Sequence, residues 1–487
     1  MLNLRSFPRA LLLGLSCLLA FGLSGTARSE GSYLGIFIQN RKIGYSSSRV
    51  SEEKVAGQTL RRTVSLTLMD LGMLGQRLTT TIQTTTLATV EGEPRQMQMV
   101  VTSSGRTQNI EANFVGNQIH VVVDNSGTLS RKTLTVPAGG RVVDDPVAAI
   151  TTDGEVGTSR ELFVLDPLTA DLVKNTVTVV GPTQVTVDGK TVEALLITVS
   201  EPRATMRIFT DPKGDLIKVE GPMGMLMLPM TREQAMADIG TDDRPLDLAE
   251  ATLIRPDKPL GPIASLERLR LRIKGPDLGR VPSDARQTVK RDGESWLVEL
   301  RRPAPHSGPS SRIAAARQAQ PEWAKPSMLI PSDTARFRNL ATRVVGTAGT
   351  TVDAARRVAA WVLANMRTNS GIGVLRDASE VLDSREGLCR DHAVLCAAIL
   401  RAAGVPTRLA SGLVYQDGAF YYHAWVEVWD GQQWYGVDST RPDGRVTPAH
   451  IKLAHGSVEQ AFTFTFLDRA TVEVLDVRRR GSTGVRE

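Results

Sequence analysis

Three residues near the C-terminus have the side chains of a nucleophilic acyl-transfer site. They are Cys389, His423 and Asp438, in that chain order. A thiolate can attack an amide carbonyl, an imidazole can hold and deliver the proton, and a carboxylate can orient the imidazole. A thiol with a histidine and an aspartate elsewhere in the chain is a pattern typical of cysteine-nucleophile enzymes.

The candidate nucleophile stands where a helix is expected to begin. Cys389 follows Gly387 and opens an apolar run that predicts a helix over 389–402, ended by the exit signal at Gly404 and Pro406. A helix N-terminus favours a thiolate through the helix dipole, and its free N–H groups can bind a developing oxyanion. This position favours a chemical role for Cys389 over that of a structural cysteine.

The other two candidates are placed by predicted strands. Apolar alternation and Asp-Gly turns predict strands near 407–415, 420–429 and 433–438. His423 lies 34 residues after the cysteine, and Asp438 lies 15 residues after His423. A hairpin can bring both side chains to the start of the helix. A helix followed by an antiparallel sheet predicts an α+β domain.

Two further helices are expected before the cysteine helix. One covers about 333–345. The other covers 351–366, with Thr351 as its N-cap and an apolar face that includes Val358 and Trp361.

Neighbouring polar residues have simpler interpretations. Cys396 shares the apolar stripe of its helix and is expected in the core. Asp391 and His392 point around the helix from Cys389 and are interpreted as structural or groove-lining. Trp425 is expected to pack beside the site or within the core.

Nothing in the sequence calls for a cofactor or a metal. His450 and His455 follow the strand region without a partner pattern for metal binding. Methionines cluster over 223–236, where thioethers could bind copper(I), but their alternation also fits a strand packed with adaptable side chains. We expect apolar packing there.

The stretch 386–440 resembles the transglutaminase-like superfamily, cysteine enzymes related in fold to papain. The matching pieces are Gly387-Leu388-Cys389-Arg390-Asp391-His392-Ala393, Leu400-Arg401-Ala402-Ala403-Gly404-Val405-Pro406-Thr407-Arg408, His423-Ala424-Trp425-Val426-Glu427-Val428 and Trp434-Tyr435-Gly436-Val437-Asp438-Ser439-Thr440. The resemblance covers about 350–440. One departure is Thr368, where many relatives carry an aromatic residue. The resemblance therefore does not identify the residue that forms this wall of the acyl pocket.

The resemblance implies a Cys389–His423–Asp438 triad and a thioester acyl-enzyme. Release of the acyl group to water would make the domain a peptidase or amidase. Release to an amine would make it a crosslinking protein-glutamine acyltransferase. Bacterial-looking relatives with this resemblance are often taken to be peptidases, so hydrolysis of peptide amides is expected first. A non-catalytic envelope-binding scaffold is a third reading.

The N-terminus has the pattern of a secretory signal peptide over 1–29. Arg5 and Arg9 precede an apolar run of about 14 residues, and small residues follow up to Ala27. Cleavage near Ala27 is expected, with retention as an uncleaved membrane anchor as the alternative. The residues before Cys17 do not match a lipoprotein signal. We expect an exported, periplasmic or extracellular protein.

Export would leave two cysteines, Cys389 and Cys396. Their separation along one helix is roughly 10 Å, and a disulfide needs Cα atoms within about 7 Å. The two thiols are therefore expected to stay unpaired, which favours a chemical use for at least one of them in an oxidising compartment.

The 487 residues are enough for several domains. Strand-like alternation over 30–250 predicts a β-rich domain with a curved antiparallel sheet or half-barrel. A linker with a short β segment is expected over 251–310. The transglutaminase-like domain is expected over 311–475. This domain is expected to take a protein or peptide substrate, such as one of the cell envelope. The β-rich domain is expected to recruit that substrate or an apolar ligand.

The charge pattern gives little support for nucleic-acid binding. The net charge is +6, and basic residues are scattered apart from Arg478–Arg480. No stripe of lysine and arginine interleaved with aromatic residues is present, so nucleic acid is not an expected partner.

Overall fold

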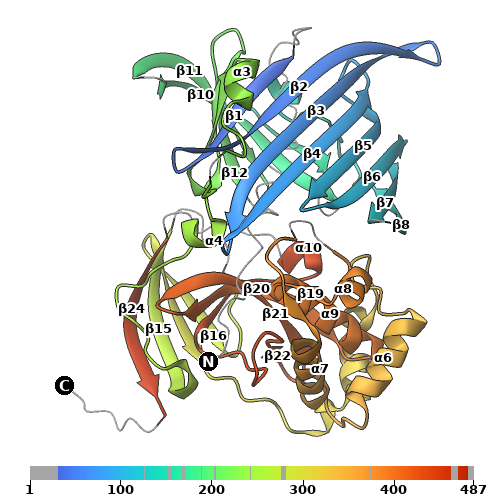
Figure 1. The fold of residues 1–487 in the computed structure, drawn as a ribbon, viewed down its shortest axis with the longest axis vertical. Coiled ribbons are helices and arrows are strands. Elements are labelled where there is room, and N and C mark those ends of the chain that lie inside the picture. The colour runs from blue at the N-terminus through green and yellow to red at the C-terminus, as the bar shows by residue number, and fades with distance from the viewer. Residues whose placement is uncertain are drawn as a thin grey trace. The chain divides into compact units, whose positions relative to one another are not determined.

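The computed structural model describes residues 31–480, apart from 126, 152–154, 167–169, 188, 202–203, 242, 276–280, 373–375 and 462–469. Within this part of the chain, residues up to Leu248 gather in one compact unit, and nearly all of those from Ala249 onward gather in another (Figure 1). The expected signal peptide over 1–29 lies outside the described residues.

The N-terminal unit is built on one large antiparallel sheet, as the sequence predicts. Fourteen strands in its described part pair in the order β8-β7-β6-β5-β4-β3-β2-β1-β14-β13-β12-β11-β10-β9, and Figure 1 shows a curved layer. The strands are Ser32–Ile38 (β1), Arg41–Val55 (β2), Gln58–Met73 (β3), Gln76–Ala88 (β4), Pro94–Ser103 (β5), Arg106–Val115 (β6), Gln118–Asn125 (β7), Thr128–Thr135 (β8), Ser159–Leu165 (β9), Leu172–Val187 (β10), Lys190–Ser200 (β11), Thr205–Thr210 (β12), Leu216–Glu220 (β13) and Met225–Met230 (β14).

The side chains of this sheet alternate as the two-residue period of a strand requires. In β4, Leu78, Thr80 and Ile82 are buried, whereas Thr79 and Gln83 are exposed. Because threonine and β-branched residues fit a pleated surface, the Thr-rich sequence of β4 forms a strand despite its polarity.

The methionine-rich stretch packs into this unit. Met225 and Met227 are buried in β14, and Met223 is buried just before the strand. Strand β14 pairs with β1, so these thioethers lie within the sheet as expected. Short helices complete the unit: Ala148–Thr151 (α2), Pro222–Gly224 (η1), Arg232–Met236 (α3) and Leu248–Ala251 (α4), the last at the boundary between the units.

The C-terminal unit combines helices with two four-stranded sheets and one two-stranded pair among its described residues. The first sheet has the order β22-β21-β20-β23, the second has β16-β17-β15-β24, and β18 pairs with β19. The strands are Leu266–Lys274 (β15), Gln287–Asp292 (β16), Ser295–Arg301 (β17), Arg367–Thr368 (β18), Glu386–Gly387 (β19), Thr407–Gln416 (β20), Ala419–Trp429 (β21), Trp434–Val437 (β22), His450–Gly456 (β23) and Thr471–Arg479 (β24).

The helices of this unit lie mostly before and around the cysteine helix. They are Ile263–Ser265 (η2), Pro309–Ser311 (η3), Ile313–Ala319 (α5), Pro321–Ala324 (η4), Ala335–Val345 (α6), Thr351–Asn365 (α7), Ala378–Ser384 (α8), Cys389–Ala402 (α9) and Val458–Ala461 (α10). In Figure 1, helices α6, α7, α8 and α9 gather beside strands β20, β21 and β22.

The predicted helices are confirmed, with one corrected cap. Helix α7 begins at Thr351, but its N-cap is Thr350, whose Oγ1 accepts a hydrogen bond of 3.1 Å from the Asp353 backbone nitrogen. The expectation that Thr351 is the cap is therefore wrong. Thr350 has the extended backbone that a cap requires, and Thr351 is already helical.

Further strands join the three predicted near 407–415, 420–429 and 433–438, and others form the second four-stranded sheet. Strand β23 adds a fourth strand beside β20. Strands β15 and β17, in the segment 251–310 expected to be a linker with a short β segment, pair with each other, and β15 pairs with β24 from the chain's end. None of the helices in the described part of the chain combines the length and the apolar character needed to cross a bilayer.

Candidate active site

Helix α9 places Cys389 at its first residue. All of its residues from Cys389 to Arg401 are buried. A helix that exposes no face to solvent is surrounded by protein. It packs against β20 and β21 and against helices α6, α7 and α8. The nucleophile candidate is therefore held on a rigid central element.

A buried ion pair holds the start of this helix. Asp391 accepts a hydrogen bond of 2.9 Å from the Leu388 backbone nitrogen through Oδ2, which satisfies one of the free donors at a helix N-terminus. Its Oδ1 lies 2.9 Å from Nη2 of Arg376, and both side chains are at most 1% exposed. Asp391 is thus structural, one of the two interpretations that the sequence leaves open.

Gly387 makes this arrangement sterically possible. A Cβ at this position would lie 2.4 Å from Cβ of Asp391 and 2.5 Å from its Oδ2. The φ angle of Gly387 is also +154°, which side chains rarely tolerate. The glycine two residues before Cys389 therefore allows the chain to pass directly over the Asp391 carboxylate.

His423 and Asp438 meet through the β21–β22 hairpin. His423 lies in β21, and Asp438 follows the last residue of β22, which pairs with Val426 of β21. Nε2 of His423 lies 2.9 Å from Oδ2 of Asp438. The expectation that a hairpin brings these two side chains together is confirmed.

The Cys389 side chain lies close enough to His423 to raise the pKa of that imidazole. Because Nε2 of this ring faces Asp438, Nδ1 is the nitrogen available to the thiol. The thiol, the imidazole and the carboxylate thus lie in one buried group, and each of the three residues is at most 2% exposed.

Burial and charge act in opposite directions on this pair. Burial alone would lower the pKa of His423, but the Asp438 carboxylate and the Cys389 side chain raise it to about 10. Burial would raise the pKa of Asp438, but His423 and His450 hold it well below its usual range. The imidazolium–carboxylate pair is therefore favoured at neutral pH.

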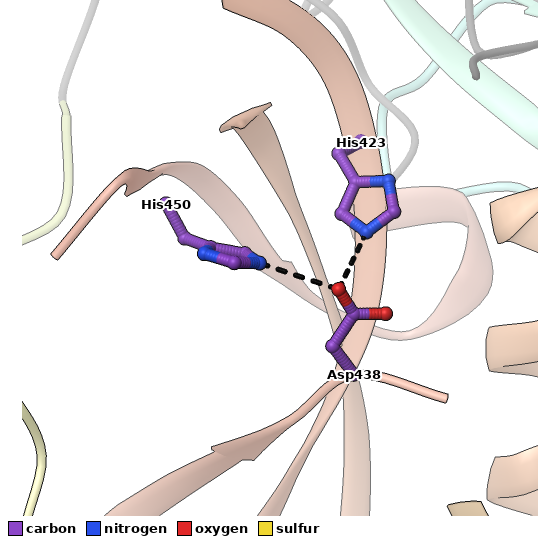
Figure 2. Close-up of side chains that lie close together, drawn as sticks. All are labelled: His423, Asp438 and His450. Atoms are coloured by element: carbon purple, nitrogen blue, oxygen red, sulfur yellow. Dashed lines mark hydrogen bonds and ion pairs between the residues drawn. The ribbon is translucent and has the colours of Figure 1, made fainter. Parts of the chain in front are cut away.

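A second histidine also reaches the carboxylate. Nε2 of His450 lies 3.3 Å from Oδ2 of Asp438, as Figure 2 shows. Sequence reasoning missed this residue, because His450 stands in β23, a strand that was not predicted. The alternation of Ile451 and Leu453 with polar residues was the available signal for that strand.

Trp425 packs against both histidines, which is the first of the two positions expected for it. Its ring is stacked near that of His423, with centroids 6.3 Å apart, and meets the His450 ring edge to face at 5.6 Å. Trp425 is 1% exposed, so it also belongs to the core. Its ring shields one side of the histidine pair from solvent.

Cys396 and His392 lie near the site but are not part of the group formed by Cys389, His423 and Asp438. Burial raises the pKa of the Cys396 thiol far above its usual range, against a hydrogen bond from Ser439. Nδ1 of His392 donates to the Ser439 carbonyl over 3.1 Å, and burial lowers the pKa of that histidine. Both residues support the segment that carries Asp438.

Charged side chains fix strand β21 in its sheet. Glu427 on β21 lies 2.7 Å from Nη2 of Arg408 on β20 and 2.7 Å from Nζ of Lys452 on β23. Lys452 also pairs with Asp284. These side chains are mostly buried, and a buried charge is tolerated only when it is paired. The cluster holds the strand that carries His423.

One cluster of the described residues offers metal-ligand atoms. His423, Asp438 and His450 each contribute one atom, all within 4.8 Å of one another, and two imidazoles with a carboxylate are common metal ligands. A metal on Nε2 of His450 would put the ring proton on Nδ1. That atom lies 3.2 Å from the Thr447 backbone nitrogen, which can only donate. The surroundings therefore fit a hydrogen-bonded cluster better than a metal centre.

Residues 338–439 match the family model described as the Transglutaminase-like superfamily. The chain therefore carries a transglutaminase-like superfamily domain in its C-terminal region, which confirms the resemblance seen in the sequence. The match contains Cys389, His423 and Asp438.

Two relatives share about a fifth of the chain. A protein-glutamine gamma-glutamyltransferase of Pseudomonas aeruginosa is 38% identical over 114 residues, which are 21% of this chain and 16% of that protein. An uncharacterised protein of Mycobacterium bovis is 32% identical over 120 residues, which are 22% of this chain and 38% of that protein. The chain thus spans well under half of the length of these relatives.

Two solved structures are also similar to this chain. A proposed cysteine protease of Cytophaga hutchinsonii is 17% identical with a TM-score of 0.30, covering 46% of this chain and 90% of that one. A proposed protease of Parabacteroides distasonis is 12% identical with a TM-score of 0.19, covering 72% of this chain and 68% of that one.

Proposed function

We propose that the C-terminal region hydrolyses peptide amides with Cys389 as the nucleophile. The observation that carries this proposal is the buried group of Cys389, His423 and Asp438. Asp438 binds the His423 imidazole, the Cys389 side chain raises the pKa of that imidazole, and Cys389 is the first residue of helix α9. A thiol beside an imidazole that is itself held by a carboxylate is the arrangement of an activated cysteine.

The first half of the reaction transfers the acyl group to sulfur. The Cys389 thiolate attacks the amide carbonyl carbon, and the carbonyl oxygen becomes an oxyanion near the N–H groups at the start of α9. The C–N bond then breaks, and the His423 imidazolium gives its proton to the leaving amine. A thioester on Cys389 and a free amine result.

The second half releases the acyl group. His423, now neutral, takes a proton from a water molecule that attacks the thioester carbonyl. The C–S bond breaks, a carboxylic acid leaves, and the thiolate–imidazolium pair is restored. Asp438 keeps the imidazole oriented in both halves.

Transfer to an amine is the second candidate function, and one observation favours it. The Pseudomonas relative that is 38% identical over 114 residues is a protein-glutamine gamma-glutamyltransferase. In this chain the same outcome would need a second amine to attack the thioester in place of water, which would form an amide crosslink and release the Cys389 thiol. The acyl-enzyme is common to both reactions, so only its acceptor distinguishes them.

The test compares the full-length protein with the Cys389→Ala variant on a peptide mixture that contains a fluorescent primary amine. Hydrolysis predicts new peptide termini or deamidated side chains, and transfer predicts incorporation of the amine, both read by mass spectrometry. Cys396→Ala is the matched control, because it removes the other thiol, and it should keep the activity. Equal product from wild type and Cys389→Ala would contradict both functions and favour a binding scaffold.

The proposal extends to export and to the N-terminal unit. A cleaved signal peptide over 1–29 would deliver the enzyme to a periplasmic or extracellular substrate, and the large β-sheet would recruit that protein substrate or an apolar ligand. Sequencing the N-terminus of the mature protein tests export, since a start near residue 28 is expected and an intact Met1 would contradict cleavage.

A further inference from the structure

His450 is fixed at the start of strand β23 and is fully buried. Its backbone nitrogen donates to the Thr447 carbonyl over 3.0 Å, and its carbonyl accepts a hydrogen bond of 2.6 Å from Nη1 of Arg286. Strand pairing adds a third constraint, because His450 lies opposite Val414 of β20. The ring therefore has a defined position beside Asp438.

The hydrogen bonds around this ring determine its tautomer. The Thr447 backbone nitrogen lies 3.2 Å from Nδ1, and a backbone N–H can only donate. The Thr447 hydroxyl lies 3.1 Å from the same atom and can donate as well. Nδ1 is therefore an acceptor without a proton, so Nε2 carries the proton and donates it to Oδ2 of Asp438.

The groups facing this ring also decide its charge. They are the Asp438 carboxylate, the His423 ring and the Arg441 guanidinium. Burial lowers the pKa of His450 to about 4 against the attraction of Asp438, and His423 and Arg441 add to the lowering. One carboxylate thus faces one charged imidazole, His423, and one neutral imidazole, His450.

The Asp438 carboxylate accepts hydrogen bonds on both oxygens. Oδ1 accepts from the Thr440 nitrogen at 2.9 Å and from the Thr440 hydroxyl at 2.7 Å. Oδ2 accepts from His423 at 2.9 Å and from His450 at 3.3 Å. These donors occupy about four acceptor positions, which is the full capacity of a carboxylate. The carboxyl group cannot rotate without breaking bonds on both oxygens.

We propose that His450 is a positioning residue that acts as a neutral hydrogen-bond donor and holds Asp438 in the orientation in which it binds His423. The inference rests on the proposed function, because it assigns a second supporting histidine to the same site. His450 does not touch the thiol. It acts on Cys389 through Asp438 and His423, as outer partners of a metal ligand or catalytic base commonly do.

Two substitutions distinguish the effect of the His450 hydrogen-bond donor from the effect of the size of its ring. His450→Phe keeps a ring of similar size and removes the donor. His450→Gln places an amide N–H near the position of Nε2 and restores the donor. His455→Phe is the matched control, because His455 lies on the same strand but pairs with Ala410 rather than packing on the carboxylate.

The first readout is the rate at which iodoacetamide alkylates Cys389 at pH 7 in the full-length protein, followed by mass spectrometry of the Cys389 peptide. This rate reports the thiolate and does not depend on any substrate. We expect His450→Phe to lower it about tenfold to a hundredfold. His450→Gln should recover most of the rate, and His455→Phe should match the wild type. An alkylation rate in His450→Phe equal to that of the wild type would overturn the inference.

The second readout uses a peptide found to be cleaved by the wild type. A positioning role predicts that His450→Phe lowers kcat while KM stays within about twofold, because the substrate does not touch His450. A thermal unfolding scan identifies a variant that has lost its fold. If His450→Phe is unfolded, the comparison between His450→Gln and wild type decides, since alkylation far slower in a folded Gln variant would contradict the donor role. Absence of any cleaved peptide would instead contradict the proposed function and leave the alkylation result standing.

Discussion

Nε2 of His423 lies 2.9 Å from Oδ2 of Asp438, and both side chains are 1% exposed. At this distance, and away from water, the carboxylate stabilises the imidazolium more strongly than it would at a solvated surface. In the proposed function, this pair is the main electrostatic support for the attacking thiolate of Cys389.

Replacing the carboxylate by an amide tests this support. Asp438→Asn keeps the shape but removes the charge, and its NH₂ group can face a ring nitrogen in the wrong tautomer. We expect kcat for peptide cleavage to fall by about 10²–10⁴. Asp443→Asn is a matched control, since Asp443 is half exposed and makes a surface pair with Arg441. Steady-state kinetics of both variants measure the effect, and equal losses would contradict the assignment.

The raised pKa of His423 predicts a pH-dependent stability. Burial opposes protonation, but Asp438 and Cys389 raise this pKa from 6.5 to about 10. A group with a raised folded-state pKa contributes stability that is fully present below about pH 6.5 and is lost as the pH rises through about 10. The free energy of unfolding should therefore fall between pH 7 and pH 10 by more in wild type than in His423→Gln.

Urea unfolding at several pH values in the presence of a reductant measures this difference. His120→Gln replaces an exposed histidine of the N-terminal sheet and should follow the wild-type curve. Parallel curves for wild type and His423→Gln would show that the imidazolium does not contribute to stability.

The two cysteines of helix α9 should differ in reactivity. Both are buried and unpaired, but the Cys389 side chain lies close enough to His423 to raise the pKa of that imidazole, whereas burial raises the pKa of Cys396 far above its usual range. We expect iodoacetamide to modify Cys389 at least about a hundredfold faster than Cys396 at pH 7. Peptide mapping after timed alkylation measures the ratio. Similar rates in the folded protein would contradict a specific activation of Cys389.

Local sequence signals were sufficient for much of the site. The start of α9 at Cys389 follows from a glycine and an apolar run, and the β21–β22 hairpin follows from alternation around an Asp-Gly turn. Each of these signals lies within a few residues of the feature it predicts. The prediction of Thr351 as the N-cap was wrong because two consecutive threonines carry the same sequence signal. Only the backbone conformation distinguishes the cap, Thr350, from the first helical residue, Thr351.

The features that the sequence did not reveal depend on distant pairing. His450 reaches Asp438 only because β23 returns to lie beside β20. Likewise, Lys452 on β23 meets Glu427 on β21 across the intervening strand β20, and it meets Asp284 from a segment more than a hundred residues earlier. No short-range pattern encodes such contacts, since the partner of each charge is chosen by the sheet order. His450 has no partner close to it in the sequence, and its contact with Asp438 was therefore not predicted.

Gly387 gives the sharpest steric prediction. Its positive φ and the 2.4 Å approach to Cβ of Asp391 leave no room for a methyl group. Gly387→Ala should push the chain away from Asp391 and displace the start of α9, which carries Cys389. We expect the free energy of unfolding to fall by about 2–4 kcal/mol. The rate of Cys389 alkylation should fall by a larger fraction than the free energy of unfolding.

Gly349→Ala is the control, because a Cβ there meets no atom within 4 Å, and it should change the free energy of unfolding by less than about 0.5 kcal/mol. Urea unfolding and timed alkylation of both variants make the comparison, and wild-type behaviour in Gly387→Ala would show that the close approach to Asp391 is not needed to place the nucleophile.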